Sequence, residues 1–195
     1  MAKRAFDLLL SALGLLLLAP VLLLIALWVK LDSPGPVFFR QERVGRFGRP
    51  FFIHKFRTMR VDNAGLQITV GVDPRITRAG RVLRAAKLDE LPQLWDVLRG
   101  AMSLVGPRPE VPRYVALYPP KLREIVLSVR PGITDPASLS FRNESELLAA
   151  AADPEREYVE VVMPTKLRLA AAYVRRATLR TDLRVILATL GALRH

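Results

Sequence analysis

The longest apolar stretch of the chain lies near its N-terminus. Residues 8–29 read LLLSALGLLLLAPVLLLIALWV and contain no charged side chain. In a helix, about 22 residues at 1.5 Å each are long enough to cross a bilayer core of about 30 Å. A cleaved signal peptide is disfavoured, because the apolar run is too long and Leu27-Trp28-Val29-Lys30 offers no small-residue cleavage site. The pattern therefore predicts an integral membrane segment.

Two arrangements of this segment are open on the residues alone. A single spanning helix is the default, but Pro20 lies mid-run, where it removes a backbone hydrogen bond and kinks or breaks a helix. Each half then covers roughly 15–18 Å, about half of the apolar core. Basic residues flank both ends, Lys3 and Arg4 before and Lys30 and Arg40 after, which favours a re-entrant hairpin with both ends on one face. A kinked spanning helix explains the proline equally well.

After residue 31 the apolar positions follow shorter periods. Turn signals at 33–36, Gly45 and Gly48 bound two β-type runs, PVFFRQERV and RPFFIHKFRTM, which predict a hairpin within residues 32–60. Residues 61–80 read as a polar loop region. Helical patterns follow at 78–86, 89–98, 111–129 and 144–160, and a basic amphipathic helix that breaks near Thr181 ends the chain.

These elements predict an α+β, mostly helical protein with a minor β-hairpin. In the helix at 89–98, Leu91, Leu94, Trp95 and Leu98 share one apolar face, and Gly100 is a helix stop. We expect residues 1–31 to form the membrane segment and residues 32–195 to form one small domain that ends in basic amphipathic helices. A chain of 195 residues suits one compact domain with an appendage.

The amino-acid composition excludes several kinds of functional site. The chain has no cysteine and two histidines, which excludes disulfides and thiol nucleophiles and disfavours histidine-based triads and metal sites. The net charge of +12 calls for an anionic partner. Nucleic acid is one candidate, but no recognised binding motif accompanies the charge. Anionic lipid headgroups and a phosphorylated substrate fit better beside a membrane segment, and five arginines of the last helical stretch would face the lipid: Arg168, Arg175, Arg176, Arg180 and Arg184.

Two adjacent acids, Asp89 and Glu90, stand out in this basic chain. Acids at a helix start have an ordinary explanation, since they satisfy free backbone N–H groups and complement the helix dipole. Here, however, Arg84 and Lys87 precede the pair, and Arg108 follows between two prolines. A carboxylate among cations stays ionised and can act as a nucleophile, and a second carboxylate can help to hold Mg²⁺. Because arginines bind phosphate oxygens in a bidentate manner, the cluster indicates phosphoryl chemistry.

The same residues carry a family resemblance over nearly the whole chain. The chain resembles the monotopic polyprenyl-phosphate phosphoglycosyl transferases, which are bacterial sugar transferases, in their minimal, small form. The matching segments occur in the family's order: KRAFD (3–7), SPGPVFFRQERVGRFGRPF (33–51), KFRTM (55–59), ITRAGRVLR (76–84), LDELPQLWDVLRGAMSLVGPRPE (88–110) and RPGIT (130–134).

The resemblance implies an enzyme that transfers a phospho-sugar from a UDP-sugar to polyprenyl (undecaprenyl) phosphate with release of UMP. Asp89 matches the family's nucleophile, which becomes phosphoglycosylated, and Glu90 matches its partner acid. Both acids are candidate ligands of a Mg²⁺ cofactor. The remaining implied site residues are Arg84 for phosphate, Pro107, Arg108 and Pro109 for the nucleotide, and Lys55, Arg57 and Arg142 as further basic positions that line the site.

The resemblance also favours re-entry over crossing, and it implies a re-entrant membrane hairpin at 1–31 and a cytosolic catalytic domain at 32–195. Family members insert a helix-break-helix into the cytoplasmic leaflet of the bacterial inner membrane, usually broken at Ser-Pro, where this chain has Ala19-Pro20. The implied role is the start of surface-glycan, exopolysaccharide or glycoprotein glycan assembly. Departures from the family pattern at Gly100-Ala101, 135–138 and Ala170 leave the donor sugar open.

The sequence is compatible with three functions. The first is the transferase, with a UDP-sugar, polyprenyl phosphate and anionic lipids as partners, no nucleic acid, and a homodimer as an open alternative. The second is a non-catalytic membrane scaffold that recruits acidic proteins, in which Asp89 is dispensable. The third is a membrane protein that binds nucleic acid, which predicts a steep dependence of its affinity on salt.

Overall fold

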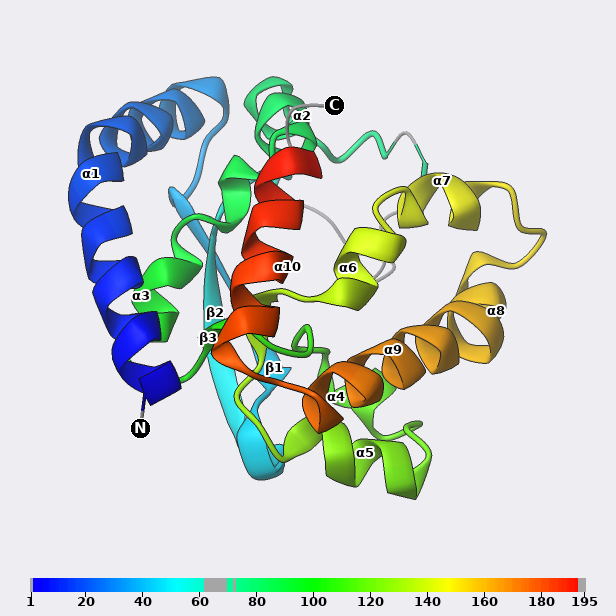
Figure 1. Cartoon of the computed structure of the whole chain (residues 1–195). Helices are drawn as coiled ribbons and strands as arrows, with labels where there is room; N and C mark the ends of the chain where they lie inside the picture. Colours follow the sequence, from blue (N-terminus) through cyan, green and yellow to red (C-terminus); the bar gives the residue numbers. More distant parts are fainter. Residues whose placement is uncertain (1, 62–69, 72, 193–195) are drawn as a thin grey trace.

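The computed structural model describes residues 2–61, 70–71 and 73–192 (Figure 1). The α-helices are α1 (Ala2–Asp32), α2 (Arg78–Ala85), α3 (Gln93–Leu98), α4 (Pro112–Val115), α5 (Pro120–Leu127), α6 (Pro136–Ser140), α7 (Glu144–Ala149), α8 (Pro154–Glu157), α9 (Met163–Arg175) and α10 (Leu179–Ala192). Three short helical segments are η1 (Arg46–Gly48), η2 (Leu88–Glu90) and the π-helical η3 (Tyr158–Val162). The strands are β1 (Phe38–Val44), β2 (Pro50–Phe56), β3 (Ser103–Val105) and β4 (Gly132–Thr134). The predicted mostly helical α+β class is confirmed.

The apolar run forms one helix. α1 continues through Pro20 without interruption, and its axis turns partway along its length (Figure 1). Most of its leucines are exposed, and its buried residues are Asp7, Ser11, Ile25 and Val29. Among the described helices, α1 is long and apolar enough to cross a membrane, with a mean hydropathy of 2.8 in its most apolar window. The predicted break is thus a bend in a continuous helix, and re-entry stays a prediction.

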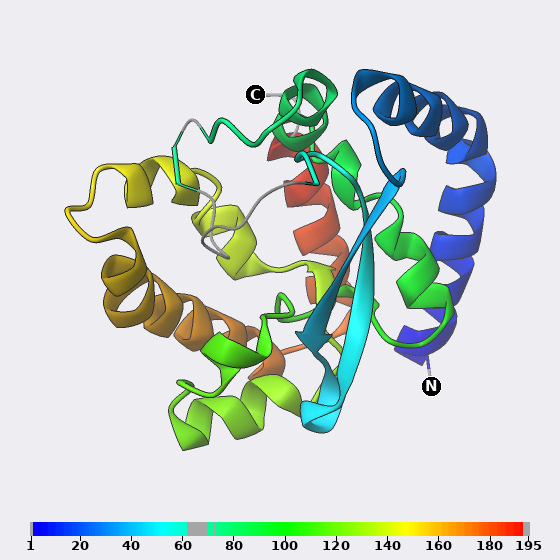
Figure 2. The ribbon, with the colours of Figure 1, turned by 180° about the vertical axis from the view of Figure 1, so that it is seen from behind.

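The predicted hairpin is confirmed. β1 and β2 pair antiparallel from Phe38↔Phe56 to Val44↔Pro50. Seen from behind, the ribbon runs between α1 and α3 on one side and the helices α4 to α9 on the other (Figure 2). Phe47 in the turn has a positive φ of 60° and an exposed ring. Residues 62–69 and 72 of the predicted polar loop lie outside the described residues.

A second sheet was not predicted. β3 and β4 pair in parallel, with Ser103 opposite Gly132 and Val105 opposite Thr134. Just beyond β3, Gly106 packs against β4 so closely that a Cβ on Gly132 would lie 2.1 Å from the Gly106 nitrogen. The segments GPRPE and RPGIT therefore meet backbone to backbone. Three-residue strands are too short to show a period of two in the sequence, which is why the pattern missed them.

Several helix boundaries differ from the prediction. The helix expected at 111–129 is two helices, because Pro119 and Pro120 interrupt it between α4 and α5. The C-terminal break falls at 176–178, near Thr181 as predicted. Thr178 caps α10 by accepting a hydrogen bond from the Thr181 nitrogen (3.1 Å), and Thr181 Oγ1 accepts one from the Thr178 nitrogen (2.7 Å). The apolar face of α3 is only partly buried and its Trp95 is exposed, while Gln93, Asp96 and Val97 are buried.

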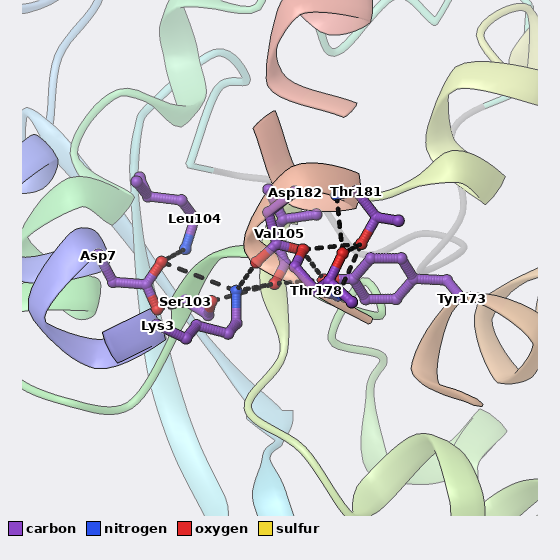
Figure 3. Close-up of polar contacts among 9 residues, drawn as sticks. All are labelled: Lys3, Asp7, Ser103, Leu104, Val105, Tyr173, Thr178, Thr181 and Asp182. Carbon is purple, nitrogen blue, oxygen red and sulfur yellow. Dashed lines mark hydrogen bonds and ion pairs between the residues drawn. The ribbon is translucent and has the colours of Figure 1, made fainter. Parts of the chain in front are cut away.

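A polar network, called here the N-terminal latch, joins the start of α1 to distant segments (Figure 3). It consists of Lys3, Asp7, Ser103, Tyr173 and Asp182. Lys3 Nζ donates to Asp182 Oδ2 (2.6 Å) and to the Val105 carbonyl (3.1 Å). Asp7 accepts from Ser103 Oγ (2.8 Å) and from the Leu104 nitrogen (3.3 Å), and the Tyr173 hydroxyl donates to Asp182. The basic residue that was predicted to flank a membrane segment thus also anchors β3 and α10.

Candidate active site

The acid pair lies on a strained turn between two helices. Lys87, which follows α2, has left-handed backbone angles (φ 55°, ψ 20°), and η2 begins directly after it. A residue with a side chain is uncommon in this conformation, and such strain often occurs at functional sites. The turn buries both acids, leaving Asp89 7% and Glu90 9% exposed. Neither η2 nor α3, both fully described, has a side-chain N-cap, so helix capping does not explain the pair.

Glu90 is held by two cations from distant segments. Its Oε1 accepts from Lys55 Nζ at 2.6 Å and from Arg108 Nη2, and its Oε2 accepts from Arg108 Nη1 at 3.1 Å. Burial on its own would raise the pKa of Glu90, but Arg108 and then Lys55 outweigh it and hold that pKa well below its usual range. Glu90 in turn raises the pKa of Arg108. Glu90 is therefore ionised and fully paired.

Asp89 differs from its neighbour. Among the described residues, its carboxylate has no hydrogen-bond or ion-pair partner. Burial raises the pKa of Asp89 above its ordinary value; Lys55 opposes this, Glu90 adds to it, and Arg84 and Lys87 oppose it more weakly. A buried, unpaired carboxylate within the field of several cations is suited to nucleophilic attack on an electron-poor phosphorus.

Lys55, Asp89, Glu90 and Arg108 are thus brought together in three dimensions. Lys55 comes from β2, and Arg108 from the loop that follows β3. Pro107 and Pro109 restrict the backbone on both sides of Arg108, and its backbone N–H points to Asp135 Oδ2 (3.4 Å). Arg84, in the last turn of α2, is half-buried and is among the charges that act on Asp89.

Two predicted site residues lie elsewhere. Arg57 is buried, and its guanidinium donates to the carbonyls of Ser33 (2.6 Å), Pro34 (2.6 Å) and Val29 (3.2 Å), so it closes the C-terminal end of α1. Arg142 is exposed in the turn between α6 and α7. The structure thus gives Arg57 a role in seating the membrane helix, and it leaves Arg142 at the surface.

The sequence did not predict a second charged cluster, which lies close to Arg108 and is centred on Glu110. Glu110 accepts from Arg43 Nη1 (2.8 Å), from the Val111 nitrogen (2.7 Å) and from the Tyr158 hydroxyl. It borders a small, partly open pocket whose lining also includes Arg108 and Asp135. Glu110 lies within the matched segment GPRPE and was detectable there, whereas nothing local in the sequence marks Tyr158.

Comparison with known proteins identifies the family. A family model described as bacterial sugar transferase matches residues 1–195. The chain belongs to the bacterial sugar transferase family. It is 41% identical over 197 residues to the UDP-glucose:undecaprenyl-phosphate glucose-1-phosphate transferase of Caulobacter vibrioides, a match covering 98% of this chain and 69% of that protein.

Two further relatives show how the family varies. A protein of the same name from Xanthomonas campestris pv. campestris is 41% identical over 194 residues, which are 96% of this chain but 38% of that protein. The UDP-N-acetylgalactosamine-undecaprenyl-phosphate N-acetylgalactosaminephosphotransferase of Aeromonas hydrophila is 40% identical over 160 residues, covering 81% of this chain and 37% of that protein. Relatives that are about equally identical to this chain are thus named for different sugars.

The acid pair of this bacterial sugar transferase can be tested as a Mg²⁺ site. Within the described part of the chain, no group of three or more Asp, Glu, His or Cys side chains could hold a metal. Mg²⁺, however, commonly binds through one or two carboxylates, water and substrate phosphates. Asp89 has oxygens that no described residue occupies, and Glu90 lies next to it. The pair therefore fits a cation shared with a bound phosphate and not a complete protein cage.

Proposed function

We propose that this bacterial sugar transferase moves a sugar 1-phosphate from a UDP-sugar to polyprenyl phosphate, giving polyprenyl-diphosphate-sugar and UMP. The names of the relatives support the donor and acceptor classes. The observation that carries the proposal is the difference between the two acids. Asp89 is buried and has no partner among the residues that the structure describes, while Glu90 is held by Lys55 and Arg108. Because the relatives' names carry different sugars, the donor is proposed as a class.

The proposed chemistry has two steps. An Asp89 oxygen attacks the phosphorus bonded to the sugar, a P–O bond forms, and the bond from that phosphorus to the UMP oxygen breaks. An oxygen of polyprenyl phosphate then attacks the same phosphorus, the aspartyl P–O bond breaks, and Asp89 is restored. Two steps allow one site to accept a water-soluble donor and a membrane-bound acceptor in turn.

The cations around the pair have distinct proposed roles. Arg108 binds the diphosphate in a bidentate manner and Lys55 adds a point charge, while Arg84 neutralises charge next to Asp89. When bound, Mg²⁺ would supply neutralisation of the pyrophosphate charge and ease the departure of UMP, with Asp89 and Glu90 as its ligands. Fixed positive charge near the reacting phosphorus usually accounts for much of such catalysis.

The membrane arrangement is part of the proposal. α1 re-enters the cytoplasmic leaflet of the bacterial inner membrane and holds the acid pair near the headgroup plane, where a polyprenyl phosphate presents its charge. The exposed leucines of α1 support a lipid-facing surface, and α10 adds an exposed apolar stripe of Leu179, Leu183, Leu187 and Leu190. Exposed arginines near this stripe suit anionic headgroups: Arg175, Arg176, Arg180 and Arg184. The lipid-linked product would start the assembly of a surface glycan or glycoprotein glycan.

The decisive experiment follows both products. Full-length protein in nanodiscs is incubated with radiolabelled UDP-sugars, undecaprenyl phosphate and Mg²⁺, and a lipid-linked radiolabelled product with equimolar UMP is expected. Mass spectrometry of donor-treated protein without acceptor should find a sugar phosphate on Asp89. Turnover without this adduct would contradict the covalent route. No turnover with any UDP-sugar would favour the scaffold, and salt-sensitive binding of DNA or RNA would favour the nucleic-acid hypothesis.

A further inference from the structure

The cations of the candidate active site are already occupied by the protein itself. Lys55 and Arg108 both donate to Glu90 Oε1, and Arg108 also donates to Oε2. The two terminal nitrogens of Arg108 are thus arranged as a fork around a planar anion. Phosphate oxygens accept from this fork in the same way as carboxylate oxygens. An incoming diphosphate that uses these donors must therefore compete with Glu90.

The burial of the three side chains sets how such an exchange can occur. The exposed fraction of the side chain is 34% for Arg108, 18% for Lys55 and 11% for Glu90. The Arg108 side chain is therefore the most accessible of the three, and the Glu90 side chain is the least accessible. The backbone of Arg108 lies between two prolines and near Asp135 Oδ2, so its guanidinium can turn toward an anion while the loop stays in place.

We infer that Glu90 acts as an internal counter-anion, which holds Lys55 and Arg108 in the free protein and is displaced from them when the diphosphate of the donor binds. This inference rests on the proposed function only for the identity of the diphosphate. The exchange keeps two partly buried cations compensated in the absence of substrate, which avoids the cost of burying unpaired charge. It also frees the Glu90 carboxylate beside Asp89 when a charged substrate enters.

The inference predicts an effect of unusual sign. Because Glu90 competes with the diphosphate, Glu90→Gln should bind UDP more tightly than the wild type in metal-free buffer. Linkage between two sites commonly amounts to 5–150-fold, and we expect a gain of about fivefold or more. Arg108→Met should weaken UDP binding by a similar factor, and in the double variant the gain from Glu90→Gln should shrink. A purely structural role of Glu90 predicts weaker binding by Glu90→Gln.

The test is calorimetric titration of the full-length protein with UDP and with inorganic pyrophosphate, in EDTA and without acceptor lipid. Glu124→Gln, an exposed acid on α5, is the matched control and should bind like the wild type. Glu90→Asp provides a second variant if Glu90→Gln folds poorly; its shorter side chain should tighten binding less. Unchanged or weaker binding of UDP and pyrophosphate by the folded Glu90 variants overturns the inference.

The result is separable from that of the proposed function. If Glu90→Gln binds a diphosphate more tightly but the wild type transfers no sugar phosphate, the inference is supported and the proposed function is contradicted. If the wild type transfers sugar phosphate but the Glu90 variants do not bind a diphosphate more tightly, the proposed function is supported and the inference is contradicted.

Discussion

The N-terminal latch and the acid pair are both built from two buried carboxylates, yet they are completed differently. In the latch, Asp7 and Asp182 are 2% and 0% exposed, and both have hydrogen-bond partners. In the acid pair, Glu90 is equally well satisfied, but Asp89 has no partner among the described residues. A paired buried charge holds segments together, whereas an unpaired one is kept reactive at a cost in stability.

The two regions are linked through one short strand. The Val105 carbonyl at the end of β3 accepts hydrogen bonds from Lys3 and Tyr173 of the latch. Gly106 follows, and then the Pro107–Pro109 loop places Arg108 on Glu90. Val105, which contacts the start of α1, and Arg108, which contacts Glu90, are therefore only a few residues apart along the chain. Changes on one side can be tested for effects on the other.

Replacing Asp89 should give the largest effect. Asp89→Asn removes the nucleophile, and transfer should fall by at least about 1,000-fold. The thermal unfolding midpoint should hold or rise at neutral pH, because a neutral amide is less costly to bury than an ionised carboxylate. UMP release and thermal unfolding in detergent measure the two effects. Asp182→Asn is the matched control, and its midpoint should fall. Wild-type turnover by Asp89→Asn would refute the assignment of the nucleophile.

Breaking the latch should cost the most stability. Lys3→Met leaves Asp182 fully buried with one remaining donor, Tyr173, and should lower the free energy of unfolding by about 3–5 kcal/mol. Lys30→Met, near the other end of α1, removes an exposed lysine that donates to the Gly35 carbonyl and should cost about 0.5 kcal/mol or less. Denaturant unfolding in detergent compares the two variants. Equal losses would show that the latch does not hold α1 in place.

A change between the two regions should affect both. A Cβ on Gly132 would lie 2.1 Å from the Gly106 nitrogen, so Gly132→Ala should cost about 1–3 kcal/mol and weaken UDP binding by moving the Pro107–Pro109 loop. Gly191→Ala on α10 meets nothing within 4 Å and should stabilise by up to about 1 kcal/mol. Unfolding and UDP titration of each variant test this link. An unaltered UDP affinity in Gly132→Ala would separate the loop from the strand.

The smallest expected effect is on the pH dependence of kcat/KM. Burial raises the pKa of Asp89 above 3.8 and Lys55 opposes this, so the loss of kcat/KM on acidification should occur above that value. Lys55→Met removes the opposing charge, and the acid limb should move to higher pH. Lys121→Met, an exposed lysine on α5, should leave it unmoved. A downward shift in Lys55→Met would contradict the placement of Lys55 beside Asp89.

The raised pKa of Asp89 also makes the stability of the folded protein depend on pH. The folded state raises the pKa of Asp89, so its contribution to stability is present below the unfolded pKa and is lost as pH rises through the folded pKa. Glu90 has the opposite sign, since its lowered pKa contributes stability above its ordinary pKa of 4.5 that is lost on acidification. The stability gain of Asp89→Asn over the wild type should therefore disappear in acid, as thermal unfolding across pH would show.

Much of the architecture could be predicted from local pattern. The uncharged run specified α1, the turn residues around two β-type runs specified β1 and β2, and the helical periods located most of the remaining helices. The matched segments identified the family and drew attention to Asp89, Glu90 and Arg108. These features were readable because each depends on residues close together along the chain, where periodicity and turn chemistry act.

Tertiary structure alone decided which charges meet. Lys3 and Asp182 are 179 residues apart, Lys55 and Glu90 are 35 apart, and no local pattern pairs them. The structure also placed Arg57 at the end of α1 and brought the short strands β3 and β4 together. It gave Asp89 no partner within 2–61, 70–71 and 73–192, beside a fully paired Glu90. The physical reason is that the state of a buried charge depends on desolvation and on partners supplied by distant segments, and both exist only once the chain has packed.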